Sequence, residues 1–278
     1  MLRRLLLSFA AVFLAGQALA QSAGGYRATA WVKTAASQVR LILPERFVPG
    51  QAVHGGIEVQ LEAGAKTYWR SPGETGVAPA LDLTASRGLK HGSLLFPAPV
   101  AFDDGAGGIA IGYTDSLIFP LSLTAETTAP ALLSVQFDFG VCHRNMCMPA
   151  AASFIVAPGE GEVDSSLAGP MASWLGRVPR RTDHPALAIT TLTERRASDM
   201  VTLEITARMP ASSERVLHAE AEGLTFTTRA LDQGVGDTIR FEAISPLPAD
   251  MAGKPTGPVT LTLIAGGDAI ERTMTTKP

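Results

Sequence analysis

Residues 132–149, LLSVQFDFGVCHRNMCMP, run from a strand pattern into a short segment that holds both cysteines of the chain. The first six residues alternate apolar and polar side chains, as a half-buried antiparallel strand requires. Turn signals rich in Gly and Pro separate several such segments, and many short strands at this spacing predict an all-β fold of β-sandwiches. The same alternation recurs at residues 39–43, 57–61, 201–205 and 259–263.

The first twenty residues have the pattern of a secretory signal peptide. Arg3 and Arg4 form a positive n-region, residues 5–15 are apolar, and residues 18–20, ALA, supply the small-x-small cleavage pattern. The apolar run is shorter than the roughly 20 residues that cross a bilayer. An uncleaved membrane anchor is the alternative. We assign residues 1–20 to the signal peptide and predict export to the periplasm, with no transmembrane segment in the mature chain.

The size and charge of the mature chain narrow the classes of partner. Removal of the signal peptide leaves 258 residues, for which two domains are the ordinary expectation. It also leaves 21 Lys and Arg against 26 Asp and Glu, a net charge of −5. This sign argues against nucleic acid and against an anionic membrane surface as partners.

The break between the two domains is expected near residues 157–184. Within 165–177, apolar residues recur at spacings of four, three and one, which predicts a short amphipathic helix. Gly169-Pro170 weakens its first turn. Strand patterns resume after the helix. We therefore predict a cysteine-bearing sandwich over residues 21–158, a connector with a short helix over 159–183, and a second sandwich over 184–278.

Cys142 and Cys147 are the only cysteines of the chain, and four residues separate them. Export places them in an oxidising compartment, where a disulfide forms and persists. One interpretation is a structural disulfide that staples a loop. Closing a loop of about six residues stabilises a fold by only ~2 kcal/mol, so a staple gains little here.

A second interpretation is thiol–disulfide exchange, for which the attacking species is a thiolate. His143 and Arg144 follow Cys142 directly, and their positive charge would lower the pKa of its thiol. A strained short-loop disulfide is also easier to reduce than a relaxed one.

A third interpretation is the binding of a soft metal ion. Thiolate, thioether and imidazole ligands together select Cu(I) over harder cations. Methionines in such a segment are equally typical of core packing. The candidate ligands are Cys142, His143, Met146, Cys147 and Met148.

Seven short motifs of the chain resemble the periplasmic N-terminal region of the DsbD/ScsB family of thiol:disulfide interchange proteins. The resemblance is strong over residues 66–150 and thin after 185. The motifs are, in chain order, YWRSPGETG (68–76), FPAP (96–99), FDDG (102–105), GY (112–113), FPL (119–121), CMPA (147–150) and RVPR (177–180).

The resemblance implies an immunoglobulin-like domain whose cysteine pair takes electrons from a membrane-embedded thiol reductase and passes them to periplasmic thioredoxin-fold proteins. No cofactor is implied besides the redox-active disulfide. It also implies a cap loop over the cysteines, with an acidic pair that matches Asp103 and Asp104. A carboxylate beside a cysteine raises the pKa of the thiol. Gly105 stands where the cap's aromatic residue is expected, and Phe102 is its candidate replacement. An Asp-Asp-Gly sequence is equally typical of a solvated turn.

We therefore expect two immunoglobulin-like β-sandwiches and a thiol–disulfide oxidoreductase that uses Cys142 and Cys147 as its catalytic pair and acts as a monomer. The resemblance favours Cys147 as the partner-facing thiol. The membrane conduit and thioredoxin-like domain of full-length members have no counterpart in the sequence, so we expect separate proteins to supply them. Two alternatives remain: a copper-tolerance protein that binds Cu(I), and a non-catalytic interaction module with a structural disulfide.

Overall fold

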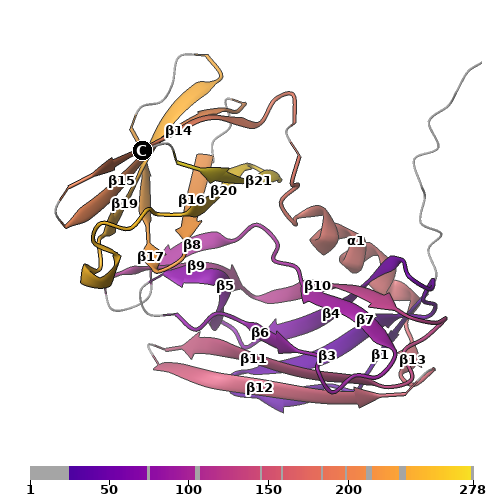
Figure 1. The fold of residues 1–278 in the computed structure, drawn as a ribbon. Helices are drawn as coiled ribbons and strands as arrows, with labels where there is room; N and C mark the ends of the chain where they lie inside the picture. The colour runs from indigo at the N-terminus through magenta and orange to yellow at the C-terminus, as the bar shows by residue number, and fades with distance from the viewer. Residues whose placement is uncertain are drawn as a thin grey trace, which may run out of the picture.

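The chain folds into two β-sandwiches, which Figure 1 shows in a computed structural model. The structure describes residues 25–73, 76–103, 107–144, 146–157, 159–182, 184–197, 199–210, 215–231 and 236–276. The predicted signal peptide at residues 1–20 lies outside the described residues. The predicted all-β fold with immunoglobulin-like sandwiches and a short helix between them is confirmed.

The first sandwich consists of two antiparallel sheets. One has the strand order β13 (Glu162–Val163), β1 (Tyr26–Ala28), β3 (Ser37–Pro44), β4 (Ala52–Leu61), β10 (Ser116–Ala125) and β7 (Leu89–Leu94), with β2 (Val32–Thr34) paired to β3. The other has the order β12 (Met146–Val156), β11 (Leu133–His143), β5 (Lys66–Gly73), β9 (Ile109–Thr114) and β8 (Val100–Asp103), with β6 (Ala80–Asp82) paired to β11.

The second sandwich repeats this plan with shorter sheets. One has the order β14 (Ala188–Arg196), β15 (Met200–Arg208), β19 (Thr238–Pro246) and β18 (Thr227–Ala230). The other has the order β17 (Leu224–Thr225), β16 (Arg215–Ala221), β20 (Pro258–Ala265) and β21 (Asp268–Thr275). The 3-10 turn η2 (Ala249–Met251) precedes β20.

The alternating runs of the sequence form strands because one face of each is buried. On β3, Val39 and Leu41 are fully buried, and Ile57 and Val59 of β4 lie opposite them in the register. Burial of each such side chain contributes about 1.5–3 kcal/mol relative to exposure. The five predicted runs fall on β3, β4, β11, β15 and β20. Their strand assignment is therefore confirmed.

The predicted helix is present as η1 (Ser165–Leu167) followed by α1 (Ala168–Gly176). Pro170 lies in the first turn of α1, where its missing N–H has no partner to lose. Leu167 and Met171 pack against Ile42 and Ile118, so the helix covers the outer face of the β3–β4–β10 sheet. No helix among the described residues is long and apolar enough to cross a membrane.

The two sandwiches contact each other through β5 and through the segment after α1. Arg180 forms a parallel bridge with Ile270, by backbone hydrogen bonds to Ala269 and from Glu271. On β5, the ring of Trp69 lies 5.2 Å, between centroids, from the ring of His218 on β16. Figure 1 places the second sandwich over the end of the first that carries β5, β8 and β9.

His218 is buried in this contact, with 6% of its surface exposed. Burial, followed by the positive charge of Arg70, lowers the pKa of His218 from 6.5 to about 4. In the folded protein, His218 is therefore neutral at pH 7. The stabilisation that the neutral ring provides is present above pH 6.5 and is lost as the pH falls from 6.5 to about 4.

Replacing this ring with a non-titrating side chain, as in His218→Gln, should flatten the pH dependence of stability. Between pH 7 and pH 4, we expect the wild-type free energy of unfolding to fall by about 3 kcal/mol more than that of the variant. Urea unfolding at both pH values measures the difference. His91→Gln, at an exposed histidine, is the control and should keep the wild-type slope. Equal slopes for all three proteins would contradict a neutral, buried His218.

Candidate functional site

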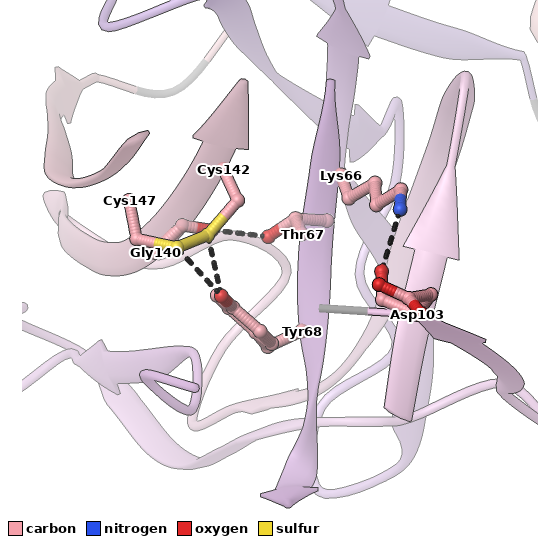
Figure 2. The surroundings of a disulfide bond; sticks show 7 residues. All are labelled: Lys66, Thr67, Tyr68, Asp103, Gly140, Cys142 and Cys147. Carbon is pink, nitrogen blue, oxygen red and sulfur yellow. Dashed lines mark hydrogen bonds between the residues drawn. A yellow bond between two sulfur atoms is a disulfide. The ribbon is translucent and has the colours of Figure 1, made fainter. Parts of the chain in front are cut away.

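The two cysteines face each other on one β-hairpin. Strands β11 and β12 pair without interruption from Leu133 and Val156 to the turn, and this register sets Cys142 directly opposite Cys147. Their Cα atoms are 4.0 Å apart and their sulfurs form a disulfide, shown in Figure 2. The pairing of the hairpin therefore brings the sulfurs together without any rearrangement of the backbone.

The hairpin closes immediately beyond the disulfide. His143 and Met146 are the last pair of the ladder, and Arg144 begins the turn with φ of 50°. Two-residue hairpin turns require this left-handed conformation, which costs a residue other than glycine about 1–2 kcal/mol. The disulfide therefore closes a short ring that contains only this turn and the last pair of the ladder.

The two cysteines differ in exposure. Cys142 is buried, with 9% of its surface exposed, whereas Cys147 is exposed and lies at the turn end of β12. Strand β12 is the edge of its sheet, so no further strand covers Cys147 among the described residues. Of the two cysteines, Cys147 is therefore the more accessible to solvent.

Tyr68 contacts both sulfurs. Its hydroxyl oxygen lies 2.6 Å from Cys142 Sγ and 3.3 Å from Cys147 Sγ. Disulfide sulfurs carry no hydrogen, so the hydroxyl is the donor. A donor aimed at this point forms a stronger hydrogen bond with a thiolate than with a disulfide, because the acceptor is then charged. We therefore expect the Tyr68 hydroxyl to stabilise a Cys142 thiolate once the disulfide opens.

Two glycines leave room for the Tyr68 ring. A Cβ atom at Gly140 would lie 3.0 Å from two ring carbons, and one at Gly76 would lie 2.6 Å from the ring. The hydroxyl of Thr67 donates to the carbonyl oxygen of Gly140 over 2.8 Å and joins β5 to β11 at this level. The two glycines leave space for the Tyr68 ring beside the disulfide, and the Thr67 hydrogen bond keeps β5 next to β11 at this level.

The β8–β9 hairpin lies against the same cluster. Phe102 of β8 is half-buried and packs with Tyr68, Ala110 and Cys142. Lys66, opposite Cys142 in the register, lies 4.8 Å from the centroid of the Phe102 ring. Its ammonium also donates to the backbone oxygen of Asp103 over 2.8 Å, as Figure 2 shows. The structure thus places Phe102 where a shielding aromatic residue would stand.

Of the four charged residues predicted around the site, the structure describes three, Asp103, His143 and Arg144. Asp103 ends β8 and contacts Lys66 through its backbone oxygen, and Asp104 lies outside the described residues. His143 is 3.6 Å from a carboxylate oxygen of Glu62, measured from its Nδ1. Arg144 is exposed in the turn. Of the predicted residues, the structure brings Cys142, Cys147 and Phe102 together.

The five predicted Cu(I) ligands do not converge on one point. Side chains alternate between the two faces of a strand, so the register places Cys142 and Cys147 on one face of the hairpin. His143, Met146 and Met148 lie on the opposite face. Among the described residues there is also no group of three or more His, Cys, Asp or Glu side chains arranged to hold a metal ion.

An exposed and a buried cysteine, paired on the outer face of an immunoglobulin-like domain, define a site for disulfide exchange. Residues 38–158 match the family model described as thiol:disulfide interchange protein DsbD, N-terminal. Over these residues the chain resembles a thiol–disulfide interchange domain of the DsbD N-terminal type, and the predicted resemblance to the DsbD/ScsB family is confirmed there.

A solved structure extends the likeness in fold to both sandwiches. The N-terminal periplasmic domain of ScsB from Proteus mirabilis superposes with a TM-score of 0.71 at 22% sequence identity. The match covers 90% of this chain and 98% of that one. At this identity the likeness shows the fold. No curated protein sequence matches the chain significantly.

Sequence reasoning missed two residues that contact the cysteines or their cap. Tyr68 belongs to a motif of the family resemblance, yet nothing in the alternation around it shows that its hydroxyl reaches the sulfurs. Lys66 stands opposite Cys142 only because β5 pairs with β11 across a long sequence separation. A sequence carries the order of its strands but not their register.

Loss of the Tyr68 hydroxyl should raise the pKa of the Cys142 thiol. In the reduced protein carrying Cys147→Ala, Tyr68→Phe should raise that pKa by about one to two units, since a hydrogen bond to a charged group is worth about 1.5–3 kcal/mol. The rate of alkylation as a function of pH measures it. Tyr113→Phe is the control, because that hydroxyl donates to the backbone oxygen of Pro97. An unchanged pKa would contradict the role of Tyr68.

Proposed function

We propose that this protein is a periplasmic thiol–disulfide oxidoreductase that shuttles electrons through the Cys142–Cys147 pair. The observation that carries the proposal is the asymmetric disulfide: Cys147 is exposed, Cys142 is buried, and the hydroxyl of Tyr68 reaches both sulfurs. The match to the DsbD N-terminal model over the same residues supports this assignment.

Reduction begins when a donor thiolate attacks Cys147 Sγ. The bond between Cys147 and Cys142 breaks, Cys142 leaves as a thiolate, and the Tyr68 hydroxyl 2.6 Å away donates to it. A leaving thiol of lower pKa leaves faster, so this bond favours the step. The donor's second thiolate then attacks the donor sulfur of the mixed disulfide and releases the Cys147 thiolate. Two electrons have moved, and the chain holds a dithiol.

Oxidation reverses these roles toward an acceptor. The Cys147 thiolate attacks the acceptor's disulfide and forms a mixed disulfide, and one acceptor sulfur leaves as a thiolate. Cys142 then attacks Cys147 Sγ, which restores the disulfide and releases the acceptor as a dithiol. The step needs no cofactor beyond the disulfide itself.

The proposed partners follow from this chemistry and from the family. The proposed electron donor is a membrane-embedded thiol reductase, and the acceptors are periplasmic thioredoxin-fold proteins with an accessible disulfide. The signal-peptide pattern at residues 1–20 and the likeness to a periplasmic domain of ScsB support the location. An oxidising compartment keeps such disulfides available as acceptors.

Electron transfer to a thioredoxin-fold protein tests the proposed function. Reduced mature protein is mixed with an oxidised thioredoxin-fold protein whose reduction potential is about −120 mV. Alkylation and intact mass then count the thiols on each. We expect the partner to gain two thiols for every disulfide formed here, and the Cys142→Ala, Cys147→Ala double variant to transfer none. No transfer, from a protein that a small aromatic disulfide still oxidises, would overturn the proposal.

The order of attack follows from exposure and is tested with single-cysteine variants. Reduced Cys142→Ala keeps the exposed Cys147, and reduced Cys147→Ala keeps the buried Cys142. We expect the first to react at least about tenfold faster with an aromatic disulfide at pH 7, because reactivity follows thiolate access. The absorbance of the released thiolate gives both rates. The reverse order would assign Cys142 as the attacking residue.

A further inference from the structure

The backbone pairing of strand β5 with β9 is interrupted after Tyr68. The strand pairs with β9 at Lys66, Thr67 and Tyr68, and the register then shifts so that the next pair is Gly73 with Ala110. Its pairing with β11 is confined to Lys66 and Thr67. The residue whose hydroxyl reaches the sulfurs therefore stands at the end of a ladder. Between Tyr68 and Gly73, contacts other than this pairing must fix the strand.

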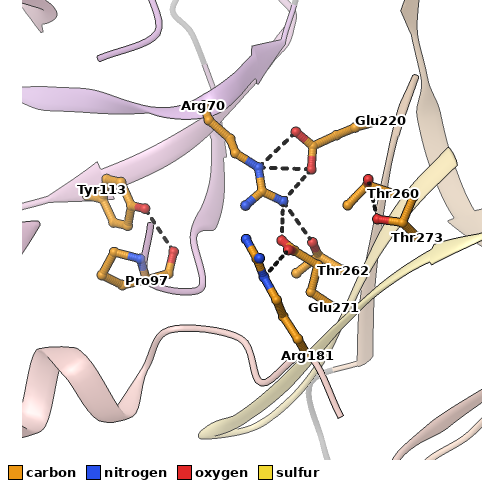
Figure 3. A network of polar contacts seen from close by, with 9 residues as sticks. All are labelled: Arg70, Pro97, Tyr113, Arg181, Glu220, Thr260, Thr262, Glu271 and Thr273. Carbon is orange, nitrogen blue, oxygen red and sulfur yellow. Dashed lines mark hydrogen bonds and ion pairs between the residues drawn. The ribbon is translucent and has the colours of Figure 1, made fainter. Parts of the chain in front are cut away.

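Arg70 supplies such contacts, and among the described residues its hydrogen bonds and ion pairs are to the second sandwich. Its Nε lies 3.0 and 3.2 Å from the two carboxylate oxygens of Glu220 on β16, and one terminal nitrogen lies 2.6 Å from the second of them. The same nitrogen is 2.6 Å from Glu271 on β21 and 3.3 Å from the hydroxyl of Thr262 on β20. Figure 3 shows this one side chain bound to three strands of one sheet.

The Arg70 guanidinium also makes a cation–π contact. It lies 4.4 Å from the centroid of the Trp69 ring, which is fully buried in the core of the first sandwich. Arg70, Glu220 and Glu271 keep 26%, 20% and 12% of their side-chain surfaces exposed. Bidentate, partly desolvated pairs of this kind fix geometry as well as add energy.

A second ion pair, between the segment after α1 and the second sandwich, serves as a comparison. Arg180 lies 2.7 Å from Asp268 and is 47% exposed on its side chain. It belongs to the segment after α1 and lies outside β5. We expect the removal of its charge to weaken the contact of this segment with the second sandwich and to leave β5 unchanged.

We propose that Arg70 is a positioning residue for the cysteine pair: by binding Glu220 and Glu271 it fixes β5 beyond its ladder and so holds the Tyr68 hydroxyl on the two sulfurs. The inference rests on the proposed redox function, and it gives the second sandwich a task in it. A hydroxyl held in place stabilises the reduced form more than the disulfide, because its bond to a thiolate is charge-assisted. Loss of the Arg70 contacts should therefore shift the pair toward the disulfide.

The test is the thiol–disulfide equilibrium of the mature protein in glutathione buffers, read by alkylation and intact mass. Arg70→Gln should shift the equilibrium constant at least threefold toward the disulfide, about 14 mV at 29.6 mV per tenfold. Tyr68→Phe should shift it in the same direction by at least as much. Arg180→Gln removes the same charge at the contact between the sandwiches and should leave the constant within 1.5-fold of wild type.

A double-mutant cycle separates positioning from general damage. If Arg70 acts through Tyr68, then adding Arg70→Gln to Tyr68→Phe changes the constant by less than 1.5-fold. The loss of thermal stability caused by Arg70→Gln should persist in both backgrounds. Should Arg70→Gln fail to fold, Arg70→Lys keeps the charge without the bidentate geometry, and it should produce a smaller shift that also vanishes in the Tyr68→Phe background.

Two results would overturn the proposal. One is a constant within 1.5-fold of wild type for folded Arg70→Gln, which would make the ion pairs purely structural. The other is an equal shift with and without the Tyr68 hydroxyl, which would mean that Arg70 acts on the cysteines by another route. These outcomes are independent of the proposed function, because glutathione tests the pair itself and the thioredoxin-fold protein tests its partners.

Discussion

The arrangement of the site depends on the direct pairing of Cys142 with Cys147 across the β11–β12 hairpin. Because side chains alternate along a strand, this pairing fixes which face of the hairpin every neighbour occupies. Val141 enters the core, and the disulfide lies on the outer face of the sheet. The outer face gives a partner access to Cys147, while β5 and β8 still cover Cys142. A shift of one residue in register would abolish all of these features together.

Strand β5 carries residues that contact the disulfide, the core and the second sandwich. Thr67 joins the strand to β11, Tyr68 reaches the sulfurs, and Trp69 fills the core. Arg70, next in sequence, binds the second sandwich. The side chains of these four consecutive residues thus lie in four different environments. The strand leaves its ladder between Tyr68 and Gly73, and the side-chain contacts of Trp69 and Arg70 lie in that interval.

Much of the fold was predictable because a strand with one buried face has alternating apolar and polar residues. The runs on β3, β4, β15 and β20 are examples. The short helix was predictable for the same reason. The cysteine pair was predictable from the two cysteines themselves, whereas Phe102 was a candidate only through the family resemblance. The contacts of Tyr68, Lys66 and Arg70 were not, because each depends on the register or docking of segments far apart in sequence. His218 likewise stands alone in the sequence and lies in a buried contact in the structure.

The reduction potential of the Cys142–Cys147 pair tests the central claim most directly. Mature protein is equilibrated across a graded series of thiol and disulfide buffers, and the alkylated cysteines are counted by intact mass. The account predicts a potential within the range of working oxidoreductases, about −120 to −270 mV. A potential below about −300 mV would mark the bond as a structural disulfide and would contradict the account.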